Sequence, residues 1–269
     1  MRTKKLLLYV FLILFSVLAV DAQPWDCTET LQDTISLDTT FVVENTNCTK
    51  SKNVEIVSTF AVPSALITYG IITRFTPQLQ KFDHNIDTKI NQIIDRKYKF
   101  DDYIQYAPYV AVFGLDLCGV RAKHSFVERT LVVGTSVLIM GTSVMVTKQL
   151  TNIQRPDESN YHSFPSGHTA TSFLGAHILF REYKDVSPWI GVTGYAVAFT
   201  TGTMRMINRK HWFSDVVTGA GVGVLSAELS YIMLPVWQKL FRFESHQSGL
   251  AITPIVITNY YGIGGTYVF

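Results

Sequence analysis

Residues 154–180 read QRPDESNYHSFPSGHTATSFLGAHILF, a polar loop that changes into an apolar run at Pro165-Ser166-Gly167. A proline and a small polar residue directly before an apolar run are typical of a helix N-terminus. The backbone N–H groups of such a first turn, together with the positive end of the helix dipole, favour a bound anion. The sequence therefore predicts a helix that begins near Ser166 and faces an anion with its first turn.

Apolar segments of similar length recur along the chain, and 47% of its residues are hydrophobic against 16% charged. This balance is typical of a membrane-embedded helical protein, and the net charge of +2 gives no sign of nucleic-acid binding. We expect an all-α, multi-pass transmembrane helical bundle of about six helices. The segments are 57–73, 104–120, 130–147, 166–180, 189–204 and 214–236. The third and the last are the cleanest spans, while the others fall short of the about 20 residues that a bilayer needs.

Small residues within these segments are expected where two helices approach closely, namely at Gly134, Gly141, Gly219 and Gly223. A different pattern lies between the first two segments. Phe82, Ile86, Ile90, Ile93 and Ile94 repeat there at helical spacing among Asp, Lys and Gln. This pattern predicts an amphipathic helix, which either lies on the membrane surface above a substrate entrance or packs over a soluble core.

The two ends of the chain differ from its middle. Residues 1–22 have the basic start, apolar run and small residues of a signal peptide, with an uncleaved membrane anchor as the alternative. Residues 23–53 are predicted to be an exposed polar lead-in that contains Cys27 and Cys48, which could form a disulfide after export. Residues 54–240 form the helical domain, and 250–269 have the β-branched and aromatic composition of a short C-terminal β-hairpin.

Three motifs carry residues suited to phosphate chemistry. Lys148 and Arg155 flank the start of the polar loop, and Arg205 directly follows the fifth apolar segment. These three cations can neutralise a phosphoryl group, and the guanidinium fork matches phosphate oxygens. Ser166 and Gly167 would add the donors of the helix start.

Two histidines supply the remaining chemistry. His211 and Asp215 are four residues apart and would share one helix face, so the carboxylate can orient the imidazole as a nucleophile. His168, next to Gly167, would protonate the leaving oxygen. No metal or other cofactor is expected, because the three cations provide the charge stabilisation that Mg²⁺ gives in other phosphoryl transfers.

In their order and spacing, the motifs resemble those of the type 2 phosphatidic acid phosphatase and vanadium haloperoxidase superfamily. They are Lys148-x6-Arg155-Pro156, Pro165-Ser166-Gly167-His168 and Arg205-x5-His211-x3-Asp215. The resemblance implies that His211 forms a phosphohistidine and that His168 protonates the leaving group. One position differs, because Met204 precedes Arg205 where the family usually has serine. Met204 cannot donate a hydrogen bond to phosphate, but we expect activity to survive.

The resemblance and the apolar bundle together indicate a phosphatase that acts on a phosphorylated membrane lipid. The candidate substrates are lipid A, undecaprenyl pyrophosphate, phosphatidic acid and phosphatidylglycerophosphate, with the first two favoured by the signs of export. The alternatives are a soluble periplasmic acid phosphatase of the same superfamily, a vanadate-dependent halide oxidase, and a non-catalytic phospholipid-binding membrane protein. The oligomeric state remains open.

Two signals conflict over the side of the membrane that the site faces. If residues 1–22 are cleaved and every later segment spans the bilayer, the loop 148–165 lies in the cytoplasm. However, Arg121, Lys123 and Arg129 cluster in a short loop, which the positive-inside tendency would place in the cytoplasm. The loop 148–165 would then lie outside, as the family resemblance also suggests. One of three premises must therefore fail: cleavage of residues 1–22, the spanning of 57–73, or the interpretation of the charge cluster. We favour an inner-membrane protein with its site facing the periplasm, and we regard the spanning of 57–73 as the weakest of the three premises.

Overall fold

The computed structural model describes residues 52–94, 99–241, 249–257 and 260–268. The predicted signal peptide, the polar lead-in and the Cys27–Cys48 disulfide lie outside these ranges, apart from Lys52 and Asn53. The helices are α2 (Lys52–Thr73), α3 (Pro77–Ile93), α4 (Asp101–Ile104), α5 (Ala107–Leu117), α6 (Phe126–Thr151), α7 (Gly167–Tyr183), α8 (Pro188–Ile207) and α9 (Phe213–Phe241). Four of the six apolar segments predicted from the sequence fall within one helix each. The segment 166–180 begins one residue before α7, and 104–120 includes the end of α4, all of α5 and three residues beyond it.

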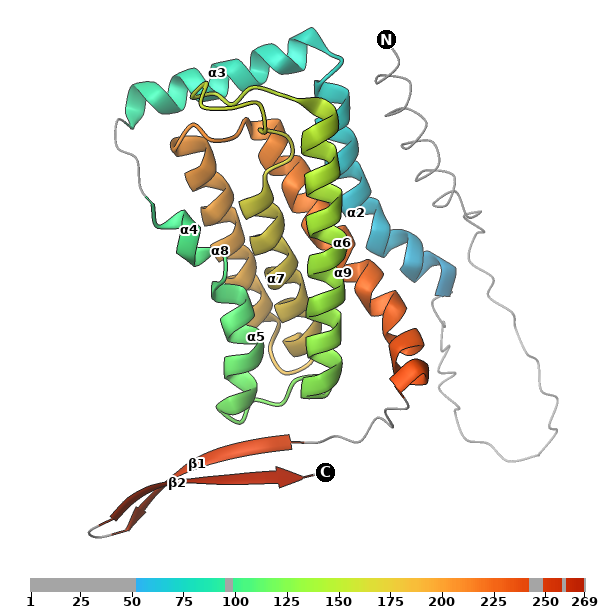
Figure 1. The fold of residues 1–269 in the computed structure, drawn as a ribbon, viewed down its shortest axis with the longest axis vertical. Coiled ribbons are helices and arrows are strands. Elements are labelled where there is room, and N and C mark those ends of the chain that lie inside the picture. Colours follow the sequence, from blue (N-terminus) through green and yellow to red (C-terminus); the bar gives the residue numbers. More distant parts are fainter. Residues whose placement is uncertain (1–51, 95–98, 242–248, 258–259, 269) are drawn as a thin grey trace, which may run out of the picture. The chain divides into compact units, whose positions relative to one another are not determined.

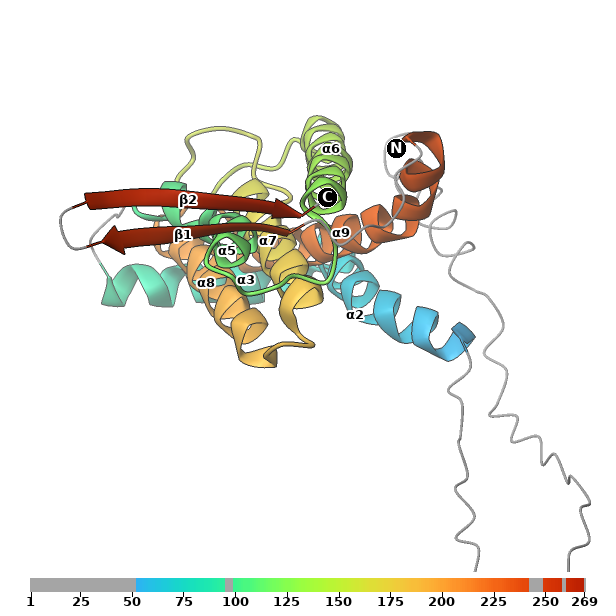
Figure 2. The same ribbon diagram turned by 90° about the horizontal axis from the view of Figure 1, so that it is seen from below.

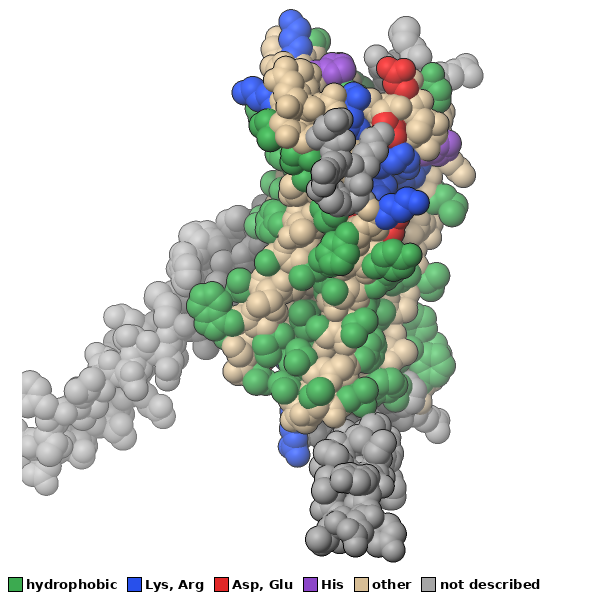
Figure 3. All heavy atoms as spheres, turned by 90° about the vertical axis from the view of Figure 1, so that its left-hand side faces the viewer, with side chains coloured by type: hydrophobic (Ala, Val, Ile, Leu, Met, Phe, Trp, Pro, Cys, Tyr) green, Lys and Arg blue, Asp and Glu red, His purple; other side chains and the backbone are tan. Residues whose placement is uncertain are grey.

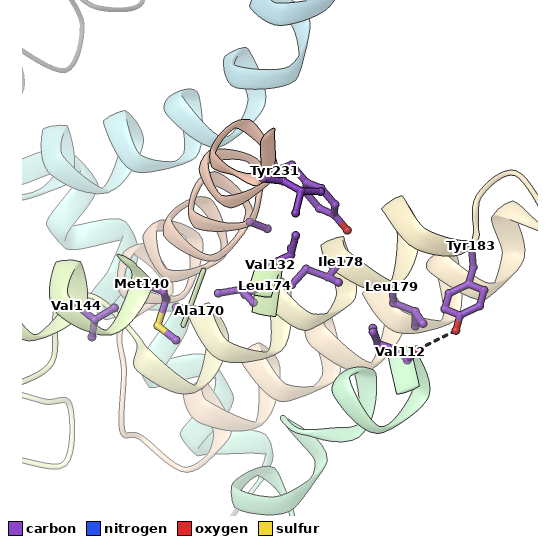
Figure 4. Packing of buried hydrophobic residues seen from close by; sticks show 12 residues of the cluster. Val112, Val132, Met140, Val144, Ala170, Leu174, Ile178, Leu179, Tyr183 and Tyr231 are labelled. Atoms are coloured by element: carbon purple, nitrogen blue, oxygen red, sulfur yellow. Dashed lines mark hydrogen bonds between the residues drawn. The ribbon is translucent and has the colours of Figure 1, made fainter. Parts of the chain in front are cut away.

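Helix α7 packs against α5, α6, α8 and α9, which lie around it in Figures 1 and 2. Its apolar side chains explain this position, because Leu174, Ile178 and Leu179 are buried in the main hydrophobic cluster. Figure 4 shows these side chains meeting Val132 of α6 and Val112 of α5. Helix α7 is therefore the central element of the bundle, and its N-terminus is held by its neighbours.

Several buried charged groups in the bundle are paired with one another. The guanidinium of Arg129 is buried, pairs with Asp116 and donates to the carbonyl of Val112 at 2.8 Å. Glu228 pairs with His177 at 2.6 Å and with Arg181 at 3.2 Å. Such pairing is expected where charges leave water. Arg129 is thus a structural cation, and only Arg121 and Lys123 of the predicted basic cluster remain in the loop before α6.

Two of the four glycines expected at close helix contacts occupy such positions. A Cβ on Gly219 would lie 2.5 Å from the carbonyl oxygen of Ser166, and one on Gly223 would lie 2.3 Å from that of Ala170. The prediction is wrong for Gly134 and Gly141, where a Cβ would meet nothing within 4 Å. Helix α9 thus approaches the backbone at the start of α7, while these two glycines of α6 face open space.

Among the described residues, two helices are long and apolar enough to cross a membrane, α6 and α9. They correspond to the segments 130–147 and 214–236, which the sequence marks as the cleanest spans. The expected total of about six spanning helices is not supported. Polarity and helix length explain part of the difference. Helix α7 buries the polar side chains Ser172 and Glu182 in the bundle, and α5 has only 11 residues.

Helix α3 lies across the end of the bundle where α8 ends and α9 begins (Figure 1). Its buried residues are acidic: Asp83 accepts from Ser214, and Asp87 pairs with Arg209 at 2.9 Å. The helix is thus attached by these polar contacts and by ring contacts of Phe82 with Phe213 and of His84 with Trp212, while Phe82 and Ile93 stay exposed. This arrangement differs from a helix that packs its apolar face over a soluble core.

At the C-terminal end, β1 (Gly249–Ile257) pairs antiparallel with β2 (Tyr260–Val268). The register places Leu250 opposite Tyr267 and Ile257 opposite Tyr260. These ranges coincide closely with the hairpin expected from the sequence.

Candidate active site

The N-terminus of α7 is fixed by a capping serine and by α9. Ser166 is the N-cap, and its buried hydroxyl lies 2.9 Å from that of Thr169. The Ser166 N–H donates to the carbonyl oxygen of Asp215 at 3.0 Å. Serine is among the best residues at this position because its oxygen satisfies a first-turn N–H. The Ser166 hydroxyl therefore serves the helix cap, and Gly167 begins the helix.

His211 is buried between α8 and α9, and its ring is held by a main-chain oxygen. Nδ1 lies 2.7 Å from the carbonyl oxygen of Ser163. Since a carbonyl only accepts, Nδ1 carries the proton and Nε2 holds the free lone pair. The carboxylate of Asp215 is 3.8 Å from Nδ1. The pair predicted from the sequence is brought together, but Ser163 makes the direct contact.

Asp215 is fully buried and organises the surrounding loops. Its carboxylate accepts from the Ser163 hydroxyl at 2.5 Å and from the Trp212 N–H at 2.9 Å. Arg74 donates to the other carboxylate oxygen at 3.0 Å. A buried charge requires such partners. Asp215 therefore joins the loop before α7, the turn before α9 and the residue after α2.

Arg74 is a cation of this site that the sequence motifs do not include. It also contacts Ser214, lies 3.5 Å from Asp83 and stacks over the Phe164 ring at 4.9 Å. Its position directly after an apolar segment resembles that of any basic residue at a helix end, so no local signal distinguishes it.

The three predicted cations act on the same region. Burial lowers the pKa of His211 to about 4, against the opposing influence of Asp215, and the charges of Lys148 and Arg205 lower it further. Burial also lowers the pKa of Arg155, with the charge of Arg205 as the next cause. Lys148 and Arg205 therefore lie close enough for their charges to act on His211, and Arg155 lies close enough to interact with both of these cations. This group of three cations near His211 is called the cationic pocket.

Each cation is positioned by a different element. Lys148, in the last turn of α6, donates to the carbonyl oxygen of His162 at 2.6 Å. The Arg155 N–H donates to the carbonyl oxygen of Asn160 at 3.0 Å, which closes the loop around it. Arg205, near the end of α8, pairs with Asp101 at 2.6 Å. Among the three predicted cations, the buried Nε atoms of Arg155 and Arg205 have no hydrogen-bond partner within the described part of the chain. The Nε atoms of Arg74 and Arg129 are unpaired there as well.

His168 lies in the first turn of α7, and its Nε2 is 2.9 Å from a carboxylate oxygen of Asp102. The same oxygen is 3.5 Å from Arg205. Neither Asp101 nor Asp102 was predicted as a site residue. The signal available was a pair of acids just before the apolar segment 104–120, which is also common at solvated helix starts.

Met204 is half-buried beside Arg205 on α8, and Thr203 next to it is exposed. Lys210 pairs with Asp157 at 2.6 Å. Burial acts to raise the pKa of Asp157, but hydrogen bonds from Lys210 and Ser159 lower it to about 2. Asp157 is therefore a paired carboxylate that fastens the loop after Arg155 to the turn before α9. It does not reach the cationic pocket through any hydrogen bond or ion pair among the described residues.

Comparison with known proteins gives one matching family and one close relative. Residues 142–239 match the PAP2 superfamily. Over 134 residues the chain is 39% identical to a protein of Porphyromonas gingivalis named lipid A 1-phosphatase. The match covers 49% of this chain and 30% of that protein, so the chain spans about a third of the relative's length.

Two solved structures are also similar. A crystal structure of Aquifex aeolicus LpxE has a TM-score of 0.42 and 22% identity, covering 54% of this chain and 93% of that one. The first transmembrane PAP2-type phosphatidylglycerolphosphate phosphatase from Bacillus subtilis has a TM-score of 0.43 and 20% identity, covering 68% and 99%.

Proposed function

We propose that this chain, whose residues 142–239 match the PAP2 superfamily, is a phosphatase that hydrolyses a phosphorylated membrane lipid. The single observation that carries the proposal is the cationic pocket, in which Lys148, Arg155 and Arg205 lie around the oriented imidazole of His211. A pocket with this excess of positive charge suits a phosphoryl group, whose negative charge must be stabilised during transfer.

The unused donors in the pocket support an anionic ligand. Buried N–H groups without partners cost free energy, so the Nε atoms of Arg155 and Arg205 gain from an incoming oxygen. Lys148 and the first turn of α7, at Gly167, add further positive potential. In this proposal the phosphoryl oxygens bind these groups, with charge stabilisation supplied by the chain's own cations.

The mechanism follows from the two histidines. Nε2 of His211 attacks phosphorus, the bond from phosphorus to the lipid oxygen breaks, and that oxygen takes a proton from His168. Asp215 stabilises the positive charge that develops on the His211 ring. Water then attacks the phosphohistidine and gives its proton to His168, which releases phosphate and restores both residues.

A lipid substrate is supported by the apolar surface. Figure 3 shows hydrophobic side chains over much of one face, with charged side chains gathered towards one end. Val110 of α5 and Phe199 of α8 are exposed, as are Leu138 of α6 and Val236 of α9. A surface of this kind suits the hydrocarbon of a bilayer. The lipid tails would stay in the membrane while the headgroup enters the pocket.

The direction of α6 indicates which side of the membrane the cationic pocket faces. Arg121 and Lys123 precede its N-terminus, whereas Lys148 lies in its last turn. If α6 crosses the bilayer, these groups lie on opposite sides, and the positive-inside tendency places Arg121 and Lys123 in the cytoplasm. We therefore propose an inner-membrane location with the pocket facing the periplasm. The partial match to a lipid A 1-phosphatase favours lipid A as substrate, with undecaprenyl pyrophosphate as the second candidate.

The test uses the purified full-length protein in detergent with a panel of lipid phosphates: lipid A, undecaprenyl pyrophosphate, phosphatidic acid and phosphatidylglycerophosphate. We expect the wild type to release phosphate from at least one of them. His211→Ala should abolish the release, because the variant lacks the imidazole Nε2 that forms the proposed intermediate. Equal release by both proteins would exclude the phosphohistidine, and no release by either would favour a non-catalytic lipid-binding protein. Extraction of membranes with carbonate separates the soluble alternative, since a soluble enzyme would leave the pellet.

A further inference from the structure

Asp102 links the two groups that the proposed reaction uses beside the nucleophile. One carboxylate oxygen lies 2.9 Å from Nε2 of His168 and 3.5 Å from Nη1 of Arg205. About half of the carboxylate surface is exposed, whereas the His168 and Arg205 side chains are largely covered. Asp102 therefore sits at the mouth of the pocket and contacts its interior.

The neighbouring carboxylate has a separate task. Asp101 is buried, accepts from Arg205 at 2.6 Å and accepts from Asn208 at 3.1 Å. These contacts fasten the short helix α4 to the end of α8. Asp101 thus fixes the place of α4 and of Arg205, which leaves Asp102 free to face His168.

We propose that Asp102 is a positioning residue for His168, holding the imidazole by Nε2 so that Nδ1 delivers the proton to the leaving oxygen. This inference rests on the proposed phosphatase function. In this arrangement each histidine has a carboxylate nearby: Asp102 for the proton donor His168, and Asp215 for the nucleophile His211. The two histidines then use opposite nitrogens, because His211 is held through Nδ1 and attacks through Nε2.

The charges around His168 explain why such a partner is needed. Burial, followed by the charge of Arg205 of α8, lowers the pKa of His168, whereas the hydrogen bond and charge of Asp102 and the charge of Asp101, both on α4, act to raise it. Lys148 of α6 adds positive charge to the same pocket. Without the carboxylate, His168 would face an excess of cations and would lose its proton more readily.

In the transfer step, the His211 Nε2–phosphorus bond forms as the phosphorus–oxygen bond to the leaving group breaks. The electron pair of the broken bond stays on that oxygen, which takes the proton from Nδ1 of His168. Asp102 remains a carboxylate throughout and keeps its hydrogen bond to Nε2. A weakly basic leaving group needs no such proton, whereas an alkoxide does. Asp102 should therefore matter for one kind of substrate and not for the other.

The experiment compares Asp102→Asn with the wild type on two probes, para-nitrophenyl phosphate and dodecyl phosphate in detergent micelles. Single-turnover formation of the phosphoenzyme is measured for both. We expect Asp102→Asn to lose about 100-fold on dodecyl phosphate and little on the aryl ester, since general acid catalysis contributes at least this much. Asp102→Ala should give the same ratio, and Asp102→Glu should recover part of the loss.

Asp101→Asn is the matched control on the same helix. It weakens the hold on Arg205, which acts on the phosphoryl group itself, so both probes should lose rate to a similar extent. The inference would be overturned if Asp102→Asn lost the same rate on both probes or lost none. It would also be overturned by a rate gain on both probes, which would mean that Asp102 only competes with the substrate for Arg205. A wild type that forms no phosphoenzyme with either probe would instead count against the phosphatase function.

Discussion

His211 and Ser163 are joined by a hydrogen bond of 2.7 Å between the imidazole Nδ1 and the main-chain carbonyl oxygen of the serine. The carboxylate of Asp215, at 3.8 Å, acts on the ring through its charge and through the Ser163 hydroxyl that it binds. The tautomer of His211 is therefore set by the backbone of the loop before α7. Asp215 holds that backbone in place, and Nε2 is left to attack.

The pH dependence of the nucleophile follows from its burial. The ordinary pKa of 6.5 falls to about 4 for His211, chiefly because burial disfavours the charged ring. Only the neutral ring attacks, so a lowered pKa extends activity towards acid. With para-nitrophenyl phosphate, phosphoenzyme formation should stay constant on acidification to about pH 5 and fall by half near pH 4. An acid limb near pH 6.5 would contradict this environment for His211.

Arg74→Gln should move the same acid limb to higher pH. Arg74 is paired with Asp215 at 3.0 Å, and removing this cation leaves the Asp215 charge to act on His211 alone, which favours the protonated ring. The protein should also lose about 3 kcal/mol of unfolding free energy, because a buried carboxylate loses its charged partner. Rate profiles and thermal unfolding measure the two effects. Arg121→Gln, at an exposed position, is the control and should change neither.

Gly219→Ala should impair both stability and turnover. The added methyl group would lie 2.5 Å from the carbonyl oxygen of Ser166, so either α9 or the start of α7 must shift. Overpacking of this kind costs about 1–3 kcal/mol, and a displacement of about 1 Å at the site can cost about 100-fold in rate.

Gly134→Ala is the matched control for this change. A Cβ at Gly134 meets nothing within 4 Å, so the substitution should raise helix stability by about 0.5–1 kcal/mol and leave turnover intact. Unfolding and phosphate release are compared for the two variants. If Gly219→Ala behaved like Gly134→Ala, the close approach of α9 to Ser166 would be refuted.

Met204→Ser should change turnover little. Arg205 is held at the pocket by its ion pair with Asp101. Position 204 precedes it on α8, and neighbouring positions on a helix point in different directions, so its side chain points to a different side of the helix from Arg205. A serine hydroxyl that reached a phosphate oxygen would instead raise kcat/KM by about tenfold or more, the effect of one charged hydrogen bond. Steady-state kinetics on the preferred lipid phosphate distinguish the two results, and a tenfold gain would show that position 204 contacts the substrate.

Many residues of the candidate site could be predicted from the sequence because they lie in three short motifs with a recognisable spacing. A lysine or arginine keeps its charge wherever it lies, and a Pro-Ser-Gly run starts a helix by local preference. The apolar segments likewise indicate helices through composition alone. Their burial is different, since Gly134 and Gly219 are alike in sequence while only one meets another helix.

The sequence by itself determined the helices, the cations Lys148, Arg155 and Arg205, and the presence of His168 and His211. Only the tertiary structure decided which groups touch those histidines: the carbonyl of Ser163, the carboxylate of Asp102, and Arg74 behind Asp215. The physical reason is that a motif fixes the order of residues along one segment. Contacts between distant segments depend on how α2, α4, α7 and α9 pack, and their pairing leaves no local pattern in the sequence.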